Sequence, residues 1–372
     1  MSNNSSTSKL ASIDVLRGLF AIMVLLGHSI ESVFTLYHDS PYSTQGNWFH
    51  ASFGHGGFWV GGFFVLSGFC IHLSINNQLR KDQFTWLHYL IARFLRLYPL
   101  FLIGLVTALV VWFQTKSGSV FPTTEFVGSL FLIQNITGVF PGYEPSWSIT
   151  SEWLYYFYWP LILGLCNWKE KSALLIAAIV GFGFMAVSWL IWKTGTGESK
   201  TSLWLPAWTI AGGVITWLAG AWLAIGWQRF RKIEGKTILS LGAWLIIPAY
   251  IANVVLLYKG ASMKWVFPFS WLSSLTFAAL IFALCRDSTK VINPPPAFSR
   301  LLGDLSYPLY LLHKPLLVMF SSLVKPLAPS IAPSVMFIGL FTVALLICAT
   351  VGVMMERGFL NWRKQILNRL PA

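Results

Sequence analysis

Residues 13–37 read IDVLRGLFAIMVLLGHSIESVFTLY, an apolar run that is long enough to cross a membrane as one helix. An arginine and a histidine, Arg17 and His28, interrupt the run eleven positions apart. Eleven steps of an α-helix make almost three turns, so both side chains share one face, roughly 16 Å apart along the axis. Ionisable groups inside a membrane span are costly and mark functional sites by default. The pair therefore predicts a reaction path along this helix.

The composition extends this interpretation to the whole chain. Of the 372 residues, 55% are hydrophobic and only 10% are charged, and the mean hydropathy is +0.64. A soluble domain carries about 25% charged residues. We therefore expect an all-α polytopic integral membrane protein, built as a single domain over residues 1–372 with no appended soluble domain. The apolar runs predict ten transmembrane helices, at 13–37, 57–75, 90–113, 147–166, 172–193, 203–225, 237–258, 267–285, 301–323 and 333–355.

An eleventh apolar segment, Glu125–Thr137, is too short to span comfortably. We expect it to be a re-entrant or interfacial helix, which membranes tolerate where it packs on protein or lines a cavity. With this segment excluded, most basic residues fall on one side, which the positive-inside rule makes the cytoplasm. Both termini are then cytoplasmic. The residues on that side are Lys9, Arg17, Arg80, Lys81, Arg93, Arg96, Lys169, Lys171, Arg229, Arg231, Lys232, Lys236, Arg286, Lys290, Arg300 and a tail with Arg357, Arg363, Lys364 and Arg369.

The net charge of +13 does not indicate a nucleic-acid partner, because the Lys and Arg residues lie in short loops between apolar runs. The four cysteines each lie within or at the end of an apolar run and form neither a disulfide nor a zinc pattern. We expect no metal site and no permanently bound cofactor.

Two further polar groups accompany the first span and the third. Glu31 follows His28 by three positions, on the same helical face, where a carboxylate can orient an imidazole and raise its basicity; a solvated interfacial carboxylate is the alternative. Arg93 and Arg96 share a face at the cytoplasmic surface, and two guanidinium groups at that spacing suit phosphate oxygens. Anchoring against lipid headgroups is the alternative for this pair.

Polar residues also enter the fourth and ninth spans. Glu152 lies about 8 Å below the start of its helix, beneath a cluster of Ser and Thr residues, and is expected to face a wet cavity. A charge that complements the helix dipole is the alternative. Ser306, Tyr310 and His313 make one face of the ninth span polar, and His313 lies at a depth similar to that of His28. The two histidines could share a site, or His313 could make a packing hydrogen bond.

Together these segments resemble the integral-membrane acyltransferase-3 family, which includes bacterial O-acetyltransferases of surface glycans. Arg17 and His28 match the Arg/Lys-ten residues-His motif, and Arg93 with Arg96 matches the Arg-x-x-Arg motif. The runs 147–152 and 305–313 are similar to the Trp-Ser-(three residues)-Glu and Leu-Ser-Tyr-x-x-Tyr-x-x-His elements, and 61–69 is also family-like. Five motifs in the right order over nearly the whole chain make the resemblance specific.

The resemblance implies transfer of an acyl group, usually acetyl, from cytoplasmic acetyl-CoA to a hydroxyl of a carbohydrate or lipid-linked acceptor at the bacterial inner membrane. Arg17, Arg93 and Arg96 would bind the donor. His28 would be the general base or a transient acyl carrier, with Glu31 or Glu152 orienting it or relaying protons. The acceptor side would comprise Asn135, Trp147, Ser148, Ser306, Tyr310 and His313.

The alternative from another class is a secondary transporter of an anionic metabolite or glycan precursor, because intramembrane Arg, His and Glu also mark substrate paths. The chain shows one irregular segment and no partner for it in the other half, whereas transporters often carry inverted repeats. The sequence leaves open the acceptor, the acyl chain length and the oligomeric state.

Overall fold

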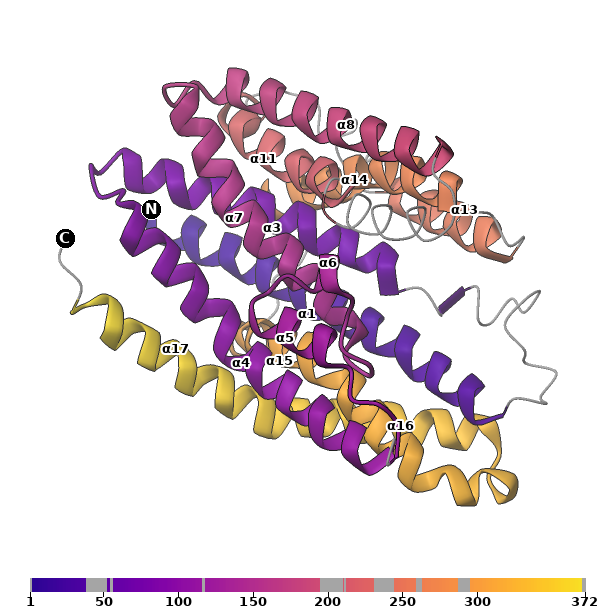
Figure 1. Ribbon diagram of the computed structural model, residues 1–372. Coiled ribbons are helices and arrows are strands. Elements are labelled where there is room, and N and C mark those ends of the chain that lie inside the picture. The colour runs from indigo at the N-terminus through magenta and orange to yellow at the C-terminus, as the bar shows by residue number, and fades with distance from the viewer. Residues whose placement is uncertain are drawn as a thin grey trace.

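The computed structural model describes residues 2–37, 52–53, 56–115, 118–194, 210, 212–230, 244–258, 263–286 and 295–369, and throughout these residues every regular element is helical (Figure 1). The main helices are α1 (Ser2–Leu36), α3 (Gly56–Leu79), α4 (Trp86–Thr115), α7 (Trp147–Leu165), α8 (Glu170–Thr194), α11 (Gly213–Phe230), α13 (Ile246–Tyr258), α14 (Met263–Arg286), α15 (Pro296–Val324), α16 (Pro333–Ile347) and α17 (Val353–Leu367). The all-α prediction is confirmed for these residues.

Six segments of the described chain are long and apolar enough to cross a membrane, which makes this a multi-pass membrane protein. They are Ala11–Leu36, Gly56–Leu79, Trp86–Thr115, Glu170–Val187, Pro296–Ser330 and Pro333–Leu367. Three more helices, α11, α13 and α14, contain shorter apolar stretches. The count of ten spans stays a prediction. Positions 203–209, 211 and 237–243 of two expected spans lie outside the described residues, as do Arg231, Lys232, Lys236 and Lys290.

The last helix extends beyond the apolar run that predicts the tenth span. Instead of stopping near residue 355, the last helix continues through a π-helical turn, η4 (Cys348–Gly352), into α17, which packs along α4 and α15. The prediction placed Arg357 and Arg363 in a tail because the apolar run ends before them. The helix continues since one of its faces, with Glu356 only 2% exposed, is buried in the protein.

The short segment Glu125–Thr137 is broken into two small helices, α5 (Thr123–Leu130) and α6 (Gln134–Thr137). Leu132, between them, has a left-handed φ of 56°, which ends the helical run. The pair lies against α4 and α7 (Figure 1), and the Tyr98 hydroxyl donates a hydrogen bond to the Leu130 carbonyl oxygen at 3.0 Å. Gln134 and Asn135 are almost fully buried. The segment is therefore a short protein-packed insertion and does not form one spanning helix.

Helix α1 lies at the centre of the bundle and packs most extensively on α15 and α3. Helices α8, α11, α13 and α14 lie on one side of α3 and α7, and α4, α15, α16 and α17 lie on the other (Figure 1). Glycines bring α1 and α15 close: a Cβ atom at Gly18 would lie 2.6 Å from Cβ of Leu302, and one at Gly303 would lie 2.7 Å from Cγ of Asp14. Small residues allow such close approach of membrane helices.

The amino end of α1 and the carboxyl end of α17 lie at the same end of the bundle (Figure 1). Helices α1 and α15 run parallel, since Asp14 lies beside Gly303 and His28 beside His313. Helix α3 runs antiparallel to them, because its first residue, Gly56, lies beside His28. This arrangement fixes which residues of the three helices meet at each depth.

Candidate functional site

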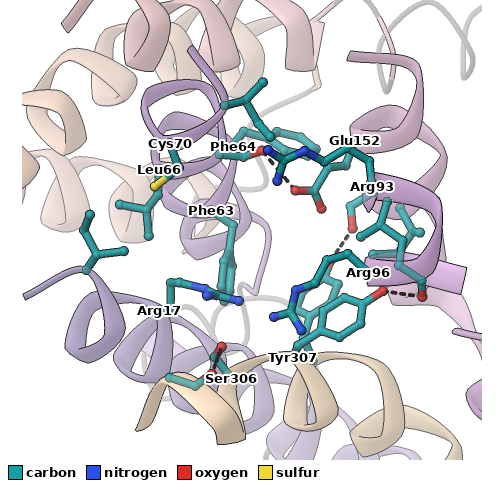
Figure 2. A pocket seen from close by; sticks show the side chains of 18 of the residues that line it. Arg17, Phe63, Phe64, Leu66, Cys70, Arg93, Arg96, Glu152, Ser306 and Tyr307 are labelled. Atoms are coloured by element: carbon teal, nitrogen blue, oxygen red, sulfur yellow. Dashed lines mark hydrogen bonds between the residues drawn. The ribbon is translucent and has the colours of Figure 1, made fainter. Parts of the chain in front are cut away.

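A cavity of about 430 Å³ lies between α1, α3, α4, α7, α15 and α17. Its wall is unusually rich in charge for the interior of a membrane protein, and it carries equal numbers of arginines and carboxylates. These residues are Asp14, Arg17, Arg93, Arg96, Glu152, Asp304, Glu356 and Arg363. Figure 2 shows the guanidinium groups of Arg17, Arg93 and Arg96 pointing into one space from helices far apart in the sequence. A polar cavity of this kind can hold an anionic group away from lipid.

Arg93 is held in place by neutral partners. Its Nη2 atom donates a hydrogen bond to Oγ of Ser74 at 2.9 Å. Its guanidinium carbon lies 5.3 Å from the ring centre of Tyr89 and 5.8 Å from that of Tyr156, within the range of cation–π attraction. Arg93 forms no ion pair with any residue that the structure describes, so its positive charge can attract an anion in the cavity.

Arg96 has a carboxylate partner that the sequence interpretation missed. Its Nη1 atom forms an ion pair with Glu356 of α17, and both side chains are largely buried, at 17% and 3% exposure. The guanidinium also lies 5.0 Å from the ring centre of Tyr307. The two arginines expected to act as one pair therefore have different surroundings: Arg96 is neutralised within the protein and Arg93 is not.

Helix α17 contributes a third element to the cavity through Glu356, Leu360 and Arg363. These positions follow the i, i+4, i+7 spacing of one helical face. That spacing is visible in the sequence, but it lies beyond the end of the last apolar run, in the segment expected to be a tail. Arg17 on α1, by contrast, has no ion-pair partner among the residues that the structure describes.

Glu152 reaches the cavity from α7 and is anchored on one oxygen. Its Oε1 atom accepts hydrogen bonds from Oγ of Ser67, at 2.9 Å, and from the hydroxyl of Tyr156. The indole Nε1 of Trp217 in turn donates to Oγ of Ser67 at 3.2 Å. The second carboxylate oxygen accepts no hydrogen bond from the described part of the chain. Glu152 thus lies in the cavity wall, held by side chains of α3, α7 and α11.

Ser148 and Tyr310 join two helices at the far end of the cavity. Their hydroxyl oxygens are 2.6 Å apart, and the Tyr310 hydroxyl lies 3.1 Å from the carbonyl oxygen of Pro145. Ser306 also lines the cavity, but its hydroxyl donates to the Gly303 carbonyl oxygen of its own helix at 2.8 Å. Three of the residues expected on the acceptor side therefore belong to the same cavity as the arginines.

His28 and His313 lie beyond this end of the cavity and are not part of its wall. The Nε2 atom of His313 is 3.0 Å from Nδ1 of His28, and the ring centres are 4.9 Å apart. The Nδ1 atom of His313 is 2.7 Å from the Leu309 carbonyl oxygen. A carbonyl oxygen only accepts, so this Nδ1 carries the proton, and the Nε2 atom of a neutral His313 is an acceptor.

The donor to that acceptor is Nδ1 of His28, which also lies 3.1 Å from the Val24 carbonyl oxygen. A neutral His28 with its proton on Nδ1 has an unprotonated Nε2. This tautomer, assigned from the hydrogen bonds, leaves Nε2 of His28 available as a base. The His28 side chain is 21% exposed and is therefore not sealed within the protein.

Glu31 has a second partner besides the histidine. Its Oε2 atom lies 4.0 Å from Nε2 of His28 and 2.9 Å from Nζ of Lys314. Lys314 is 11% exposed and Glu31 is 51% exposed, so the pair sits at the edge of the protein interior. Lys314 therefore makes the closer contact with the Glu31 carboxylate, and His28 makes the longer one.

Asn135 and Trp147 do not line the cavity. The Nδ2 atom of Asn135 donates to Oγ of Ser151 at 2.9 Å, and its buried Oδ1 has no hydrogen-bond partner in the structure. The Trp147 ring packs edge-on against Phe64, with ring centres 5.9 Å apart. Asn135 thus contacts the first turns of α7, and Trp147, the first residue of α7, contacts α3.

The chain matches the family described as "Acyltransferase domain" (Acyl_transf_3) over residues 10–353. It is 24% identical over 292 residues to the peptidoglycan O-acetyltransferase OatA of Listeria monocytogenes and 26% identical over 286 residues to the O-acetyltransferase OatA of Staphylococcus aureus. These matches cover 72% and 70% of this chain, but only 46% of each relative. The chain thus spans about half the length of these relatives.

A further relative, nodulation protein 10 of Rhizobium leguminosarum bv. viciae, is 25% identical over 337 residues, which is 84% of both chains. No solved structure matches the chain. None of the reported matches favours the secondary-transporter alternative.

Proposed function

Because the chain belongs to the acyltransferase-3 family, we propose that it transfers an acetyl group from cytoplasmic acetyl-CoA to a hydroxyl of a carbohydrate or lipid-linked glycan. The observation that carries this proposal is a cavity with several arginines that ends at Tyr310, about one helical turn before His313, whose Nε2 atom is hydrogen-bonded to Nδ1 of His28. The names of the two OatA relatives support an O-acetyl transfer in the cell envelope.

In this proposal the cavity binds the donor. Arg17 and Arg93 attract the phosphate groups of CoA, since guanidinium groups form strong charge-assisted hydrogen bonds to phosphate oxygens. Arg96 joins them when its ion pair with Glu356 is exchanged or shared. The end of the bundle with both termini faces the cytoplasm, at a bacterial inner membrane. The pantetheine arm then runs along α1, over a distance of roughly 16 Å between Arg17 and His28.

His28 supplies the chemistry in this proposal. Its Nε2 atom takes the proton of the acceptor hydroxyl, whose oxygen attacks the thioester carbonyl carbon. The carbon–sulfur bond breaks, and the CoA thiolate takes the proton back from the imidazolium. Nδ1 keeps its proton throughout and shares it with Nε2 of His313. Glu31, 4.0 Å away, and the Ser148–Tyr310 pair contribute a polar environment for the acceptor.

Transient acylation of His28 gives the same overall transfer by a second route. The two routes differ in whether the protein itself becomes labelled. Rapid quenching of protein mixed with radiolabelled acetyl-CoA, with no acceptor present, leaves label on the protein only when the histidine carries the acyl group.

The test uses purified protein in proteoliposomes with radiolabelled acetyl-CoA and soluble peptidoglycan fragments as the acceptor. We expect labelled glycan with the wild-type protein and none with His28→Ala. The matched control is His88→Ala, which removes a histidine of α4 outside the cavity wall. If His28→Ala still transfers the acetyl group, His28 takes no part in the reaction. If the wild-type protein neither transfers the acetyl group nor hydrolyses acetyl-CoA, acetyl-CoA is not the donor.

A further inference from the structure

The end of the cavity that faces the histidines is closed by side chains from three helices. On α15 the last residue of the wall is Tyr310, three positions before His313. On α3, which runs the other way, the wall residues nearest to Gly56 and thus to His28 are Val60 and Phe63. Ser148 of α7 completes this end wall through its hydrogen bond with Tyr310.

Two packed aromatic rings, those of Phe63 and Tyr310, form most of the end wall. The ring of Phe63 packs edge-on against that of Tyr310, with centres 5.4 Å apart, and against that of Phe20, with centres 5.7 Å apart. Tyr310 is 6% exposed and is held by Ser148 and by the Pro145 carbonyl oxygen. Figure 2 shows the Phe63 side chain projecting into the cavity beside Arg17.

A thioester that reaches His28 from the arginine end has to place its acyl group at this wall. The ring of Tyr310 lies between the cavity and His313, with the two ring centres 6.3 Å apart. The reacting carbonyl carbon has to come within roughly 3–3.5 Å of the attacking oxygen. Each carbon of the acyl chain beyond the carbonyl therefore competes for space with Phe63 and Tyr310.

We propose that Phe63 and Tyr310 form an acyl-size filter that restricts transfer to a two-carbon acyl group, with Phe63 as the specificity-determining residue. This inference rests on the proposed function, since it assumes that an acyl thioester occupies the cavity. Forcing extra methylene groups into a packed site costs about 1–3 kcal/mol, and one methylene changes specificity by about 10- to 200-fold. Acetyl transfer should therefore exceed butanoyl transfer by at least about tenfold in kcat/KM.

The experiment measures kcat/KM with acetyl-, butanoyl- and hexanoyl-CoA for the wild type and for Phe63→Ala. Removal of the ring should lower the acetyl-to-butanoyl ratio by at least about tenfold, mainly through a gain with butanoyl-CoA. The matched control is Phe69→Ala, which removes a fully buried ring of the same helix; Phe69 packs against Trp227 of α11 and does not line the cavity. It should lower stability and leave the ratio unchanged.

Two further variants keep the test decisive if Phe63→Ala does not fold. Phe63→Leu frees less volume at the end wall than Phe63→Ala does. It should therefore lower the acetyl-to-butanoyl ratio of kcat/KM by a smaller factor. Tyr310→Phe keeps the ring but loses the hydrogen bonds to Ser148 and to the Pro145 carbonyl oxygen. It should therefore lower the preference for acetyl over butanoyl only slightly. The size filter is wrong if wild-type protein uses acetyl- and butanoyl-CoA equally well, or if folded, active Phe63 variants keep the wild-type ratio. Wild-type protein that uses none of the three thioesters would instead overturn the proposed donor and the filter with it.

Discussion

Nε2 of His313 and Nδ1 of His28 share one hydrogen bond of 3.0 Å, although the residues are 285 positions apart in the chain. His313 accepts at Nε2 because its Nδ1 atom donates to the Leu309 carbonyl oxygen. The contact therefore selects the tautomer of His28 that has a free Nε2. If His313 only filled space between helices, it would not determine which nitrogen of His28 carries the proton.

Replacement of His313 should test this directional role. In His313→Ala the proton of His28 can move to either nitrogen, and we expect kcat to fall by about 10- to 100-fold with little change in KM for acetyl-CoA. His313→Gln retains an oxygen that can accept from Nδ1 of His28, so it should recover part of the loss. Equal kcat for the two variants would contradict the tautomer assignment.

Arg17 should contribute strongly to the attraction of the cavity for an anion, because, like Arg93, it has no ion-pair partner among the described residues. Arg17→Ala should weaken binding of CoA by about tenfold or more, as measured by titration calorimetry in detergent. The effect should shrink at high salt. Arg300→Ala, which removes an exposed arginine of α15 outside the cavity, is the control and should bind CoA normally. Unchanged affinity in the Arg17 variant would place CoA elsewhere.

Variants of the Arg96–Glu356 ion pair should have different effects on the stability of the protein and on its affinity for CoA. Glu356→Gln leaves a largely buried arginine without its counter-ion, which costs about 3 kcal/mol or more and should lower the thermal unfolding midpoint. The double variant Arg96→Met/Glu356→Leu removes both charges and should recover much of this stability. It should still bind CoA more weakly than the wild type, because a guanidinium of the cavity is lost. A double variant with normal CoA affinity would exclude Arg96 from the donor site.

Asn135 should influence the protein by stabilising the first turns of α7 and should not contact the substrates. Its amide nitrogen is already bonded to Ser151, and the side chain does not line the cavity. We expect Asn135→Ala to lose about 1 kcal/mol of stability while folded protein keeps acetyl transfer within a factor of a few. Thermal unfolding and initial rates on the same preparation measure both quantities. A large loss of rate at unchanged stability would instead put Asn135 in contact with the acceptor.

The helical class and the polar face of several spans could be predicted because they depend on local pattern. A long apolar run with Arg17 and His28 on one side is a property of one helix, and so is the spacing of Ser306, Tyr310 and His313. The segment 125–137 was excluded as a span by its length, and the structure breaks it into α5 and α6. The helix continues past the apolar run 333–355 because α4 and α15 pack against α17 and bury Glu356, and this packing cannot be seen in the local sequence.

By itself the sequence determined that this protein is a helical membrane protein and which side chains are costly to bury there, since hydropathy and helical period act within each segment. Only the tertiary structure decided which of these groups meet. The pairing of Arg96 with Glu356, of Glu31 with Lys314 and of His28 with His313 joins helices far apart in the chain. Such pairs depend on the depth and rotation of packed helices, and a buried charge or imidazole must find whichever partner that packing brings within reach.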